Sequence, residues 1–218
     1  MSIPAPSWGP PPRLARLRDG EVHVWHLSDA SPGSRTAISA MLAGYLGIEA
    51  AGVCFTRDDR GKPELASSHA SRLRFSLAHG GEIALLAVTE GVDVGVDVEP
   101  LRPESARWAL VQEALAQQER AALPSDEAAA AHAFLRSWVR KEALLKAAGV
   151  GLAVEPSLVE LRGTEIVSLP PVLGPPDAWG LVDLSLPRHV AAVAVEGSAP
   201  VLRLFRNRAA PRGAMVGR

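Results

Sequence analysis

A chain of 218 residues, 47% of them hydrophobic, can bury the core of one large domain or two small ones, which excludes disorder throughout. The 23 basic and 24 acidic side chains leave a formal net charge of -1, so no general attraction for nucleic acid is expected. The single Cys54 cannot form an internal disulfide, and the apolar runs are too short to span a membrane. We therefore expect a cytoplasmic protein with neither nucleic acid nor a membrane as partner.

Four strands and one helix are predicted in the first half of the chain. The helix is predicted after the first strand, between Ser31 and Gly47. Ser31 can cap its N-terminus, Pro32 suits its first turn and Gly47 ends it. Apolar runs and the alternation of apolar with polar side chains predict strands at residues 21–27, 73–77, 82–88 and 94–99.

Two helical regions and three further strands are predicted in the second half. A break at Pro124 separates a helical region at 104–123 from a long helix at 127–148, which Gly149 ends. The strands are expected near residues 158–161, 179–186 and 189–195.

Two segments of the chain resemble each other, namely FSLAHGGEIALLAVTEG at 75–91 and LSLPRHVAAVAVEG at 184–197. Each ends in an apolar strand, an acidic residue and glycine, and a helix precedes each pair of strands. We therefore predict an α+β fold of two similar lobes related by a pseudo-twofold axis, each with a small antiparallel sheet and a long helix. Chance similarity of two strands rich in alanine and valine is the alternative. The expected boundaries are 1–101 for the N-terminal lobe, 102–205 for the C-terminal lobe and 206–218 for a flexible basic tail.

An acidic pair lies on the predicted strand at 94–99. Asp97 and Glu99 are two residues apart, so their carboxylates project from one face while Val96 and Val98 point to the core. A hard cation such as Mg²⁺ would relieve the repulsion between the two carboxylates. An isolated acidic pair is more often a solvated strand edge, and that interpretation stays open here.

The long helix carries a second candidate group of residues. Trp138, Glu142 and Lys146 follow one another at four-residue spacing, so they share one stripe of the helix. By itself this pattern is also typical of a core tryptophan followed by a solvated ion pair.

In combination, these segments resemble the W/KEA class of surfactin-type 4′-phosphopantetheinyl transferases. The main matching motifs are GVDVE at 95–99 and WVRKEALLKAAG at 138–149. Further agreement comes from GKP at 61–63, FSLAH at 75–79, Arg35 ahead of MLAGYLG, and Glu119. The order and spacing match along residues 35–153.

The resemblance implies an enzyme that moves the phosphopantetheine arm of coenzyme A onto a serine of an apo acyl or peptidyl carrier protein, with release of adenosine 3′,5′-bisphosphate. Coenzyme A would be the co-substrate, bound between the lobes, and Mg²⁺ the cofactor, with Mn²⁺ as a substitute. Polyketide or nonribosomal peptide biosynthesis is the expected setting. Two lobes in one chain imply a monomer.

Carried over residue by residue, the resemblance implies that Asp97, Glu99 and Glu142 hold the metal. Glu142 and Lys146 would be catalytic, with Glu142 accepting the serine proton and Lys146 close to the reacting phosphate. The residues expected to contact coenzyme A are Arg35, Lys62, Pro63, Ala78, His79, Lys141 and Lys146, with Arg35 at the 3′-phosphate. Ala78 and Gly80 stand where the family has serines beside the histidine, which puts some phosphate contacts in doubt.

Several alternatives remain open at this point. His79 is the rival base by residue type. Lys141, Arg136 and Arg140 form either a solvated helix face or a contact for an acidic carrier protein. Two other functions are a magnesium-dependent hydrolase of nucleoside diphosphate derivatives, which would turn over coenzyme A without a carrier, and an inactive module that binds carrier proteins.

Overall fold

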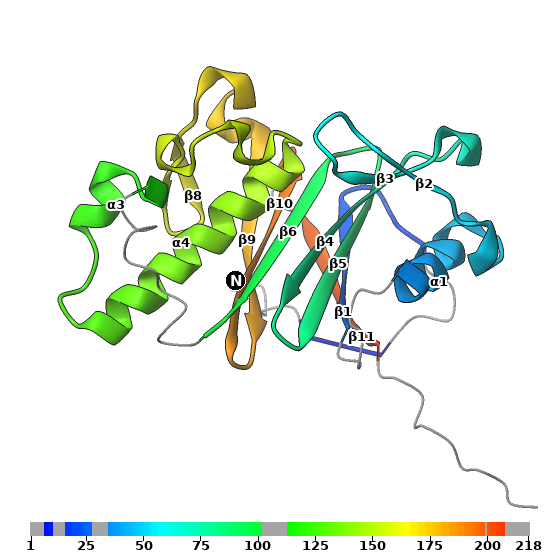
Figure 1. Ribbon diagram of the computed structural model, residues 1–218, viewed down its shortest axis with the longest axis horizontal. Helices are drawn as coiled ribbons and strands as arrows, with labels where there is room; N and C mark the ends of the chain where they lie inside the picture. Colours follow the sequence, from blue (N-terminus) through cyan, green and yellow to red (C-terminus); the bar gives the residue numbers. More distant parts are fainter. Residues whose placement is uncertain (1–6, 11–15, 28–34, 102–112, 199, 208–218) are drawn as a thin grey trace, which may run out of the picture.

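The computed structural model describes residues 7–10, 16–27, 35–101, 113–198 and 200–207. It is a mixed α+β structure in which two small sheets lie side by side, with a helix on the outer side of each (Figure 1). Among the described residues, no helix is long and apolar enough to cross a membrane.

The first sheet has four strands in the order β11-β1-β5-β4. Its members are β1 (Glu21–Leu27), β4 (Leu73–Gly80), β5 (Ile83–Glu90) and β11 (Val201–Asn207). β4 and β5 form an antiparallel hairpin, β5 runs antiparallel to β1, and β11 runs parallel to β1.

The second sheet is antiparallel and has the order β6-β10-β9. Its members are β6 (Val94–Pro100), β9 (Trp179–Leu186) and β10 (His189–Glu196). The two segments that resemble each other in sequence thus fall on the β4-β5 and β9-β10 hairpins. Each of these two sheets combines strands from both halves of the chain. The prediction of two antiparallel sheets is wrong for the first, because β11 runs parallel to β1 there. The pseudo-twofold axis and the lobe boundaries stay predictions.

Within the described ranges, three α-helices and two short hairpins accompany these sheets. The helices are α1 (Arg35–Leu46), α3 (Gln117–Ala121) and α4 (Glu127–Ala147). The hairpins pair β2 (Phe55–Arg57) with β3 (Pro63–Leu65) and β7 (Glu160–Arg162) with β8 (Glu165–Ser168). Short 3-10 turns occupy Ala50–Gly52, Ser67–His69, Gly151–Ala153, Pro156–Leu158, Pro171–Leu173 and Pro176–Ala178.

The packing follows a helix-sheet-sheet-helix order. Alternate residues of β5 point to opposite sides, so Leu86 packs under α1 while Leu85 packs against the second sheet. On β6, Val96 and Val98 occupy that same layer between the sheets. The opposite face of β6 is therefore turned toward α4, which contacts β6 and β10.

Most of the predicted elements are confirmed where the structure describes them. The first strand agrees at both ends, and α4 ends one residue before the predicted helix. Asp126 caps α4, because its Oδ1 accepts a hydrogen bond of 2.8 Å from the amide of Ala129. β11 contains Arg206 and Asn207, which were assigned to the flexible tail. Ser31, Pro32, the predicted helical residues 104–112 and the tail at 208–218 lie outside the described residues.

Candidate active site

A glycine sets the distance between β6 and α4. A Cβ atom placed on Gly95 would lie 1.9 Å from the carbonyl oxygen of Ala143 and 2.4 Å from the amide nitrogen of Ala147, both in α4. Only a residue without a side chain fits there. The close approach brings α4 against the face of β6 from which Asp97 and Glu99 project.

An ion pair and two unpartnered oxygens mark the place where β6 and α4 meet. Lys146 Nζ on α4 donates to Asp97 Oδ1 on β6 at 2.6 Å, and only 6% of Asp97 is exposed. Among the described residues, the buried atoms Asp97 Oδ2 and Glu142 Oε1 have no hydrogen-bond partner. A buried acceptor left without a partner costs about 1–3 kcal/mol, so these two oxygens favour a site for a ligand.

The carboxylates at this place are close enough to influence one another. Burial raises the pKa of Asp97, an effect that the ammonium of Lys146 opposes. Burial and the negative charge of Asp97 both raise the pKa of Glu142. The pKa of Glu99 is also raised, first by burial and then by the charge of Asp97, with a smaller contribution from Glu142. The structure therefore brings together the three carboxylates and the lysine that the sequence singled out.

The residues where β6 meets α4 suit a magnesium ion by their chemistry but do not form a closed metal site. Within the part of the chain that the structure describes, no three His, Cys, Asp or Glu side chains are grouped closely enough to hold a metal ion as they stand. The chemistry of the donor set nevertheless fits, because carboxylate oxygens are the ligands that Mg²⁺ prefers and two of the oxygens are buried without a partner. Magnesium binding accordingly belongs to the proposal below.

The loop that carries Lys62 is fastened to the C-terminal end of α4. Lys62 Nζ donates to the carbonyl oxygen of Lys146 at 2.7 Å, and Arg60 Nη1 donates to the carbonyl oxygen of Gly149 at 2.9 Å. Cations at this end of a helix satisfy its last carbonyl groups and complement its dipole. Burial lowers the pKa of Lys62. These two hydrogen bonds therefore fix the position of the loop relative to the C-terminal end of α4.

Arg35 and Pro63 line a pocket together with Phe55, and the Arg35 guanidinium carbon lies 5.4 Å from the centre of the Phe55 ring. A second pocket contains Lys62 and also borders on Pro63. On β4, Ala78 is buried and His79 is exposed. The structure thus brings Arg35, Lys62 and Pro63 to neighbouring pockets on the same side of the first sheet.

Lys141 is not assembled with these residues. Its side chain is fully buried and forms an ion pair with Glu119, and its Nζ also donates to the carbonyl oxygen of Ala114 at 2.8 Å. The same oxygen of Glu119 accepts from the amide of Ala116 at 2.7 Å. Both alternatives for Lys141, a solvated helix face and a contact for a carrier protein, are wrong, because this ammonium is enclosed in the core against Glu119. The enclosed ammonium also offers coenzyme A no accessible donor.

The neighbouring arginines have a shared partner that sequence reasoning missed. Arg140 forms two hydrogen bonds with Asp183 on β9, at 2.8 and 2.7 Å, and Arg136 lies 3.9 Å from the same carboxylate. Asp183 is 43 residues from Arg140 along the chain, so no local pattern signalled the pair. The carboxylate of Asp183 therefore partly neutralises the positive charges of Arg136 and Arg140.

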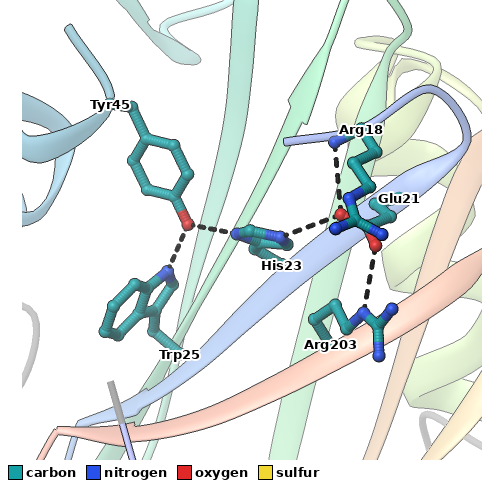
Figure 2. Close-up of polar contacts among 6 residues, drawn as sticks. All are labelled: Arg18, Glu21, His23, Trp25, Tyr45 and Arg203. Atoms are coloured by element: carbon teal, nitrogen blue, oxygen red, sulfur yellow. Dashed lines mark hydrogen bonds and ion pairs between the residues drawn. The ribbon is translucent and has the colours of Figure 1, made fainter. Parts of the chain in front are cut away.

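A polar network fixes α1, the helix that begins at Arg35, to the first sheet (Figure 2). The Tyr45 hydroxyl accepts a hydrogen bond of 2.8 Å from Trp25 Nε1 and lies 2.8 Å from His23 Nδ1. His23 Nε2 lies 3.4 Å from Glu21, which also accepts from Arg203 Nε at 3.0 Å. Each link from Trp25 to Glu21 has one donor and one acceptor when His23 is neutral, with its proton on Nε2 and the Tyr45 hydroxyl donating to Nδ1. The network thus links α1, β1 and β11.

The network predicts that the protein loses stability in mild acid. Burial lowers the pKa of His23 below its ordinary value of 6.5, so the folded state resists protonation and the unfolded state does not. The contribution of His23 to the free energy of unfolding is therefore complete above pH 6.5 and is lost as the pH falls below it. Urea unfolding at several pH values should show a steeper loss for the wild type than for His23→Gln. Parallel curves would contradict the prediction.

The chain is similar in sequence to known 4′-phosphopantetheinyl transferases. The sequence model of the 4′-phosphopantetheinyl transferase superfamily matches residues 93–173. The 4′-phosphopantetheinyl transferase HetI of Nostoc sp. strain PCC 7120 is 34% identical over 228 residues, which cover 88% of this chain and 94% of the relative. The transferase AcpT of Salmonella typhimurium is 39% identical over 99 residues, or 42% of this chain and 47% of AcpT.

A mammalian relative matches over part of its length. The L-aminoadipate-semialdehyde dehydrogenase-phosphopantetheinyl transferase of Mus musculus is 29% identical over 141 residues, or 60% of this chain and 46% of the relative. The family match and the named relatives show an enzyme that transfers phosphopantetheine from coenzyme A to carrier proteins. The chain belongs to the 4′-phosphopantetheinyl transferase superfamily.

Proposed function

We propose that the transfer takes place where β6 meets α4, with Asp97, Glu99 and Glu142 as the ligands of Mg²⁺ and Lys146 beside the reacting phosphate. The observation that carries this proposal is the meeting of three carboxylates and one ammonium, with Asp97 Oδ2 and Glu142 Oε1 buried and unpartnered among the described residues. Bound there, Mg²⁺ would neutralise charge on the pyrophosphate of coenzyme A.

The protein side chains have separate roles in the reaction. A serine hydroxyl of the carrier attacks the β-phosphorus, and the bond to the bridging oxygen breaks as adenosine 3′,5′-bisphosphate leaves. Glu142 accepts the serine proton, and its raised pKa makes it a better base than an exposed carboxylate. The Lys146 ammonium stabilises the negative charge on the departing oxygen. The exposed His79 remains the rival base.

The coenzyme A contacts in this proposal come from α1, from β4 and from the β2-β3 hairpin. Arg35 binds the 3′-phosphate, and Pro63 lines the nucleotide pocket, since both already border on one cavity. Lys62, Ala78 and His79 complete the predicted set. Lys141 does not belong to this set, because its ammonium is buried against Glu119.

The proposal extends to the oligomeric state, the cellular location and the class of carrier protein. We propose a monomer of two lobes, acting in the cytoplasm on carrier proteins of polyketide or nonribosomal peptide biosynthesis, with Mn²⁺ able to replace Mg²⁺. The resemblance of the β4-β5 and β9-β10 segments supports the two lobes. The similarity to HetI over most of both chains supports the activity.

The test is incubation of the protein with Mg²⁺, a panel of apo-carrier proteins and either coenzyme A or dephospho-coenzyme A as donor. The mass of each carrier is then measured by mass spectrometry. Coenzyme A should add one phosphopantetheine group to at least one carrier. Dephospho-coenzyme A should be the poorer donor, with a higher Michaelis constant, because Arg35 would lose its phosphate partner. Equal constants for the two donors would remove Arg35 from the 3′-phosphate. Release of adenosine 3′,5′-bisphosphate without a carrier would instead favour the hydrolase.

A further inference from the structure

The lysine assigned to the phosphate is paired with a residue assigned to the metal. Lys146 Nζ lies 2.6 Å from Asp97 Oδ1, while the other oxygen of Asp97 has no hydrogen-bond partner among the described residues. Both a lysine ammonium and a divalent cation neutralise carboxylates, and two cations held at one carboxylate repel each other. The Lys146 ammonium and the proposed metal ion would therefore compete for the carboxylate of Asp97.

The backbone at Lys146 is held in place, but its side chain is not enclosed. The carbonyl of Lys146 accepts the hydrogen bond from Lys62, and α4 is pressed against Gly95 one turn before the helix ends. The Lys146 side chain is 32% exposed, whereas that of Asp97 is 8% exposed. A flexible four-carbon stem on a fixed backbone can therefore swing its ammonium away from Asp97 and toward solvent.

The ammonium of Lys146 also acts on the whole acidic group. Its Nζ donates to Asp97 from α4, the helix that also carries Glu142, and Asp97 shares one face of β6 with Glu99. One ammonium thus compensates charge within an acidic group of three carboxylates. A metal ion bound by the same carboxylates would neutralise their negative charge in place of the Lys146 ammonium.

We propose that Lys146 is an internal counter-cation that competes with the divalent cation for Asp97, so that metal binding releases its ammonium toward the phosphate. This inference rests on the proposed function, since it assumes that Asp97 is a metal ligand. In this arrangement Lys146 weakens metal binding while it supports the folded acidic site. The release couples the arrival of the metal to the availability of the catalytic ammonium.

The test is Mn²⁺ binding to the full chain without coenzyme A, measured from the electron paramagnetic resonance signal of free Mn²⁺. Lys146→Met keeps most of the stem and removes the charge, and it should bind Mn²⁺ about tenfold more tightly than the wild type, since a like charge is gone. Arg162→Met is the charge control. It removes one positive charge from an exposed ion pair with Glu165 on the β7-β8 hairpin, outside the acidic site, so its affinity should stay within about threefold of the wild type.

A stability measurement keeps the test valid if Lys146→Met folds less well. Without metal, this variant should unfold at a lower temperature, because three carboxylates lose their shared cation. Saturating Mn²⁺ should raise its unfolding temperature by more than it raises that of the wild type. Lys146→Gln provides a second uncharged variant and should show the same pattern.

The outcomes separate this inference from the proposed function. Asp97→Asn should weaken Mn²⁺ binding strongly in both the wild-type and the Lys146→Met backgrounds, although two carboxylates remain. If metal binding depends on Asp97 but Lys146→Met binds Mn²⁺ no more tightly than the wild type, the competition is refuted and the metal site stands. If the wild type and Lys146→Met both fail to bind Mn²⁺, the proposed metal site and the competition are refuted together.

Discussion

Glu142→Gln is expected to slow phosphopantetheine transfer by about a hundredfold or more, because an amide cannot accept the serine proton. Coenzyme A should still bind, since Arg35 and Pro63 are untouched. Single-turnover transfer to an apo-carrier, measured across a Mg²⁺ titration, separates loss of the base from loss of a metal ligand. If Glu142 serves as the base, additional metal should not restore the rate.

Two controls strengthen the Glu142→Gln experiment. Glu127→Gln makes the same chemical change in the exposed first turn of α4, and its turnover should match the wild type. Asp97→Ala should also abolish transfer at ordinary Mg²⁺ but recover in part at high Mg²⁺ or with Mn²⁺, because two carboxylates remain. Near-normal turnover by Glu142→Gln would remove this residue from the metal site and the proton path, and would make His79 the leading base.

Gly95→Ala is expected to destabilise the protein by about 3 kcal/mol or more, at the upper end of what overpacking in a core costs. The new methyl group would overlap the carbonyl oxygen of Ala143, which is backbone and cannot rotate away. α4 would have to move off β6, and Glu142 and Lys146 would move with it. Urea unfolding measures the stability, and transfer assayed on the fraction that folds should also fall.

The control for this substitution is Gly44→Ala in α1. A Cβ atom at Gly44 meets no atom within 4 Å, so alanine fits without displacing anything. Because glycine is a poor helix former, this change should stabilise the protein by about 0.5–1 kcal/mol. A Gly95→Ala protein as stable as the wild type would mean that α4 does not approach β6 as closely as described.

The elements that local pattern determines were predictable from the sequence. β1, β9 and α4 carry clear periodicity over seven residues or more, and a cap or a glycine marks the ends of α4. The shared face of Asp97 and Glu99 follows from alternation alone, and the stripe that joins Glu142 to Lys146 follows from helical spacing. Both patterns depend only on neighbours within one element, so they do not require the fold.

Other parts of the architecture were decided by pairing between distant segments. β11 joins β1 across most of the chain, and β2 and β3 are only three residues long, too short to show an alternation. The predicted strands gave no indication that β6 would pair with β10. Strand pairing depends on which hydrophobic faces meet after the chain has collapsed, and local periodicity carries no information about that choice.

At the site, the tertiary structure decided which charges are available. On the helix, Lys141 and Lys146 are similar basic residues in one sequence motif, yet Lys141 is buried against Glu119 while Lys146 reaches Asp97. The direction of each side chain around α4 was fixed by the sequence. Which partner it meets depends on the element packed against that side, and the energy of a charge depends on the partner and on burial. The sequence therefore determined the acidic face of β6 and the stripe of Glu142 and Lys146 on α4. The close packing of α4 on Gly95 brought the two together.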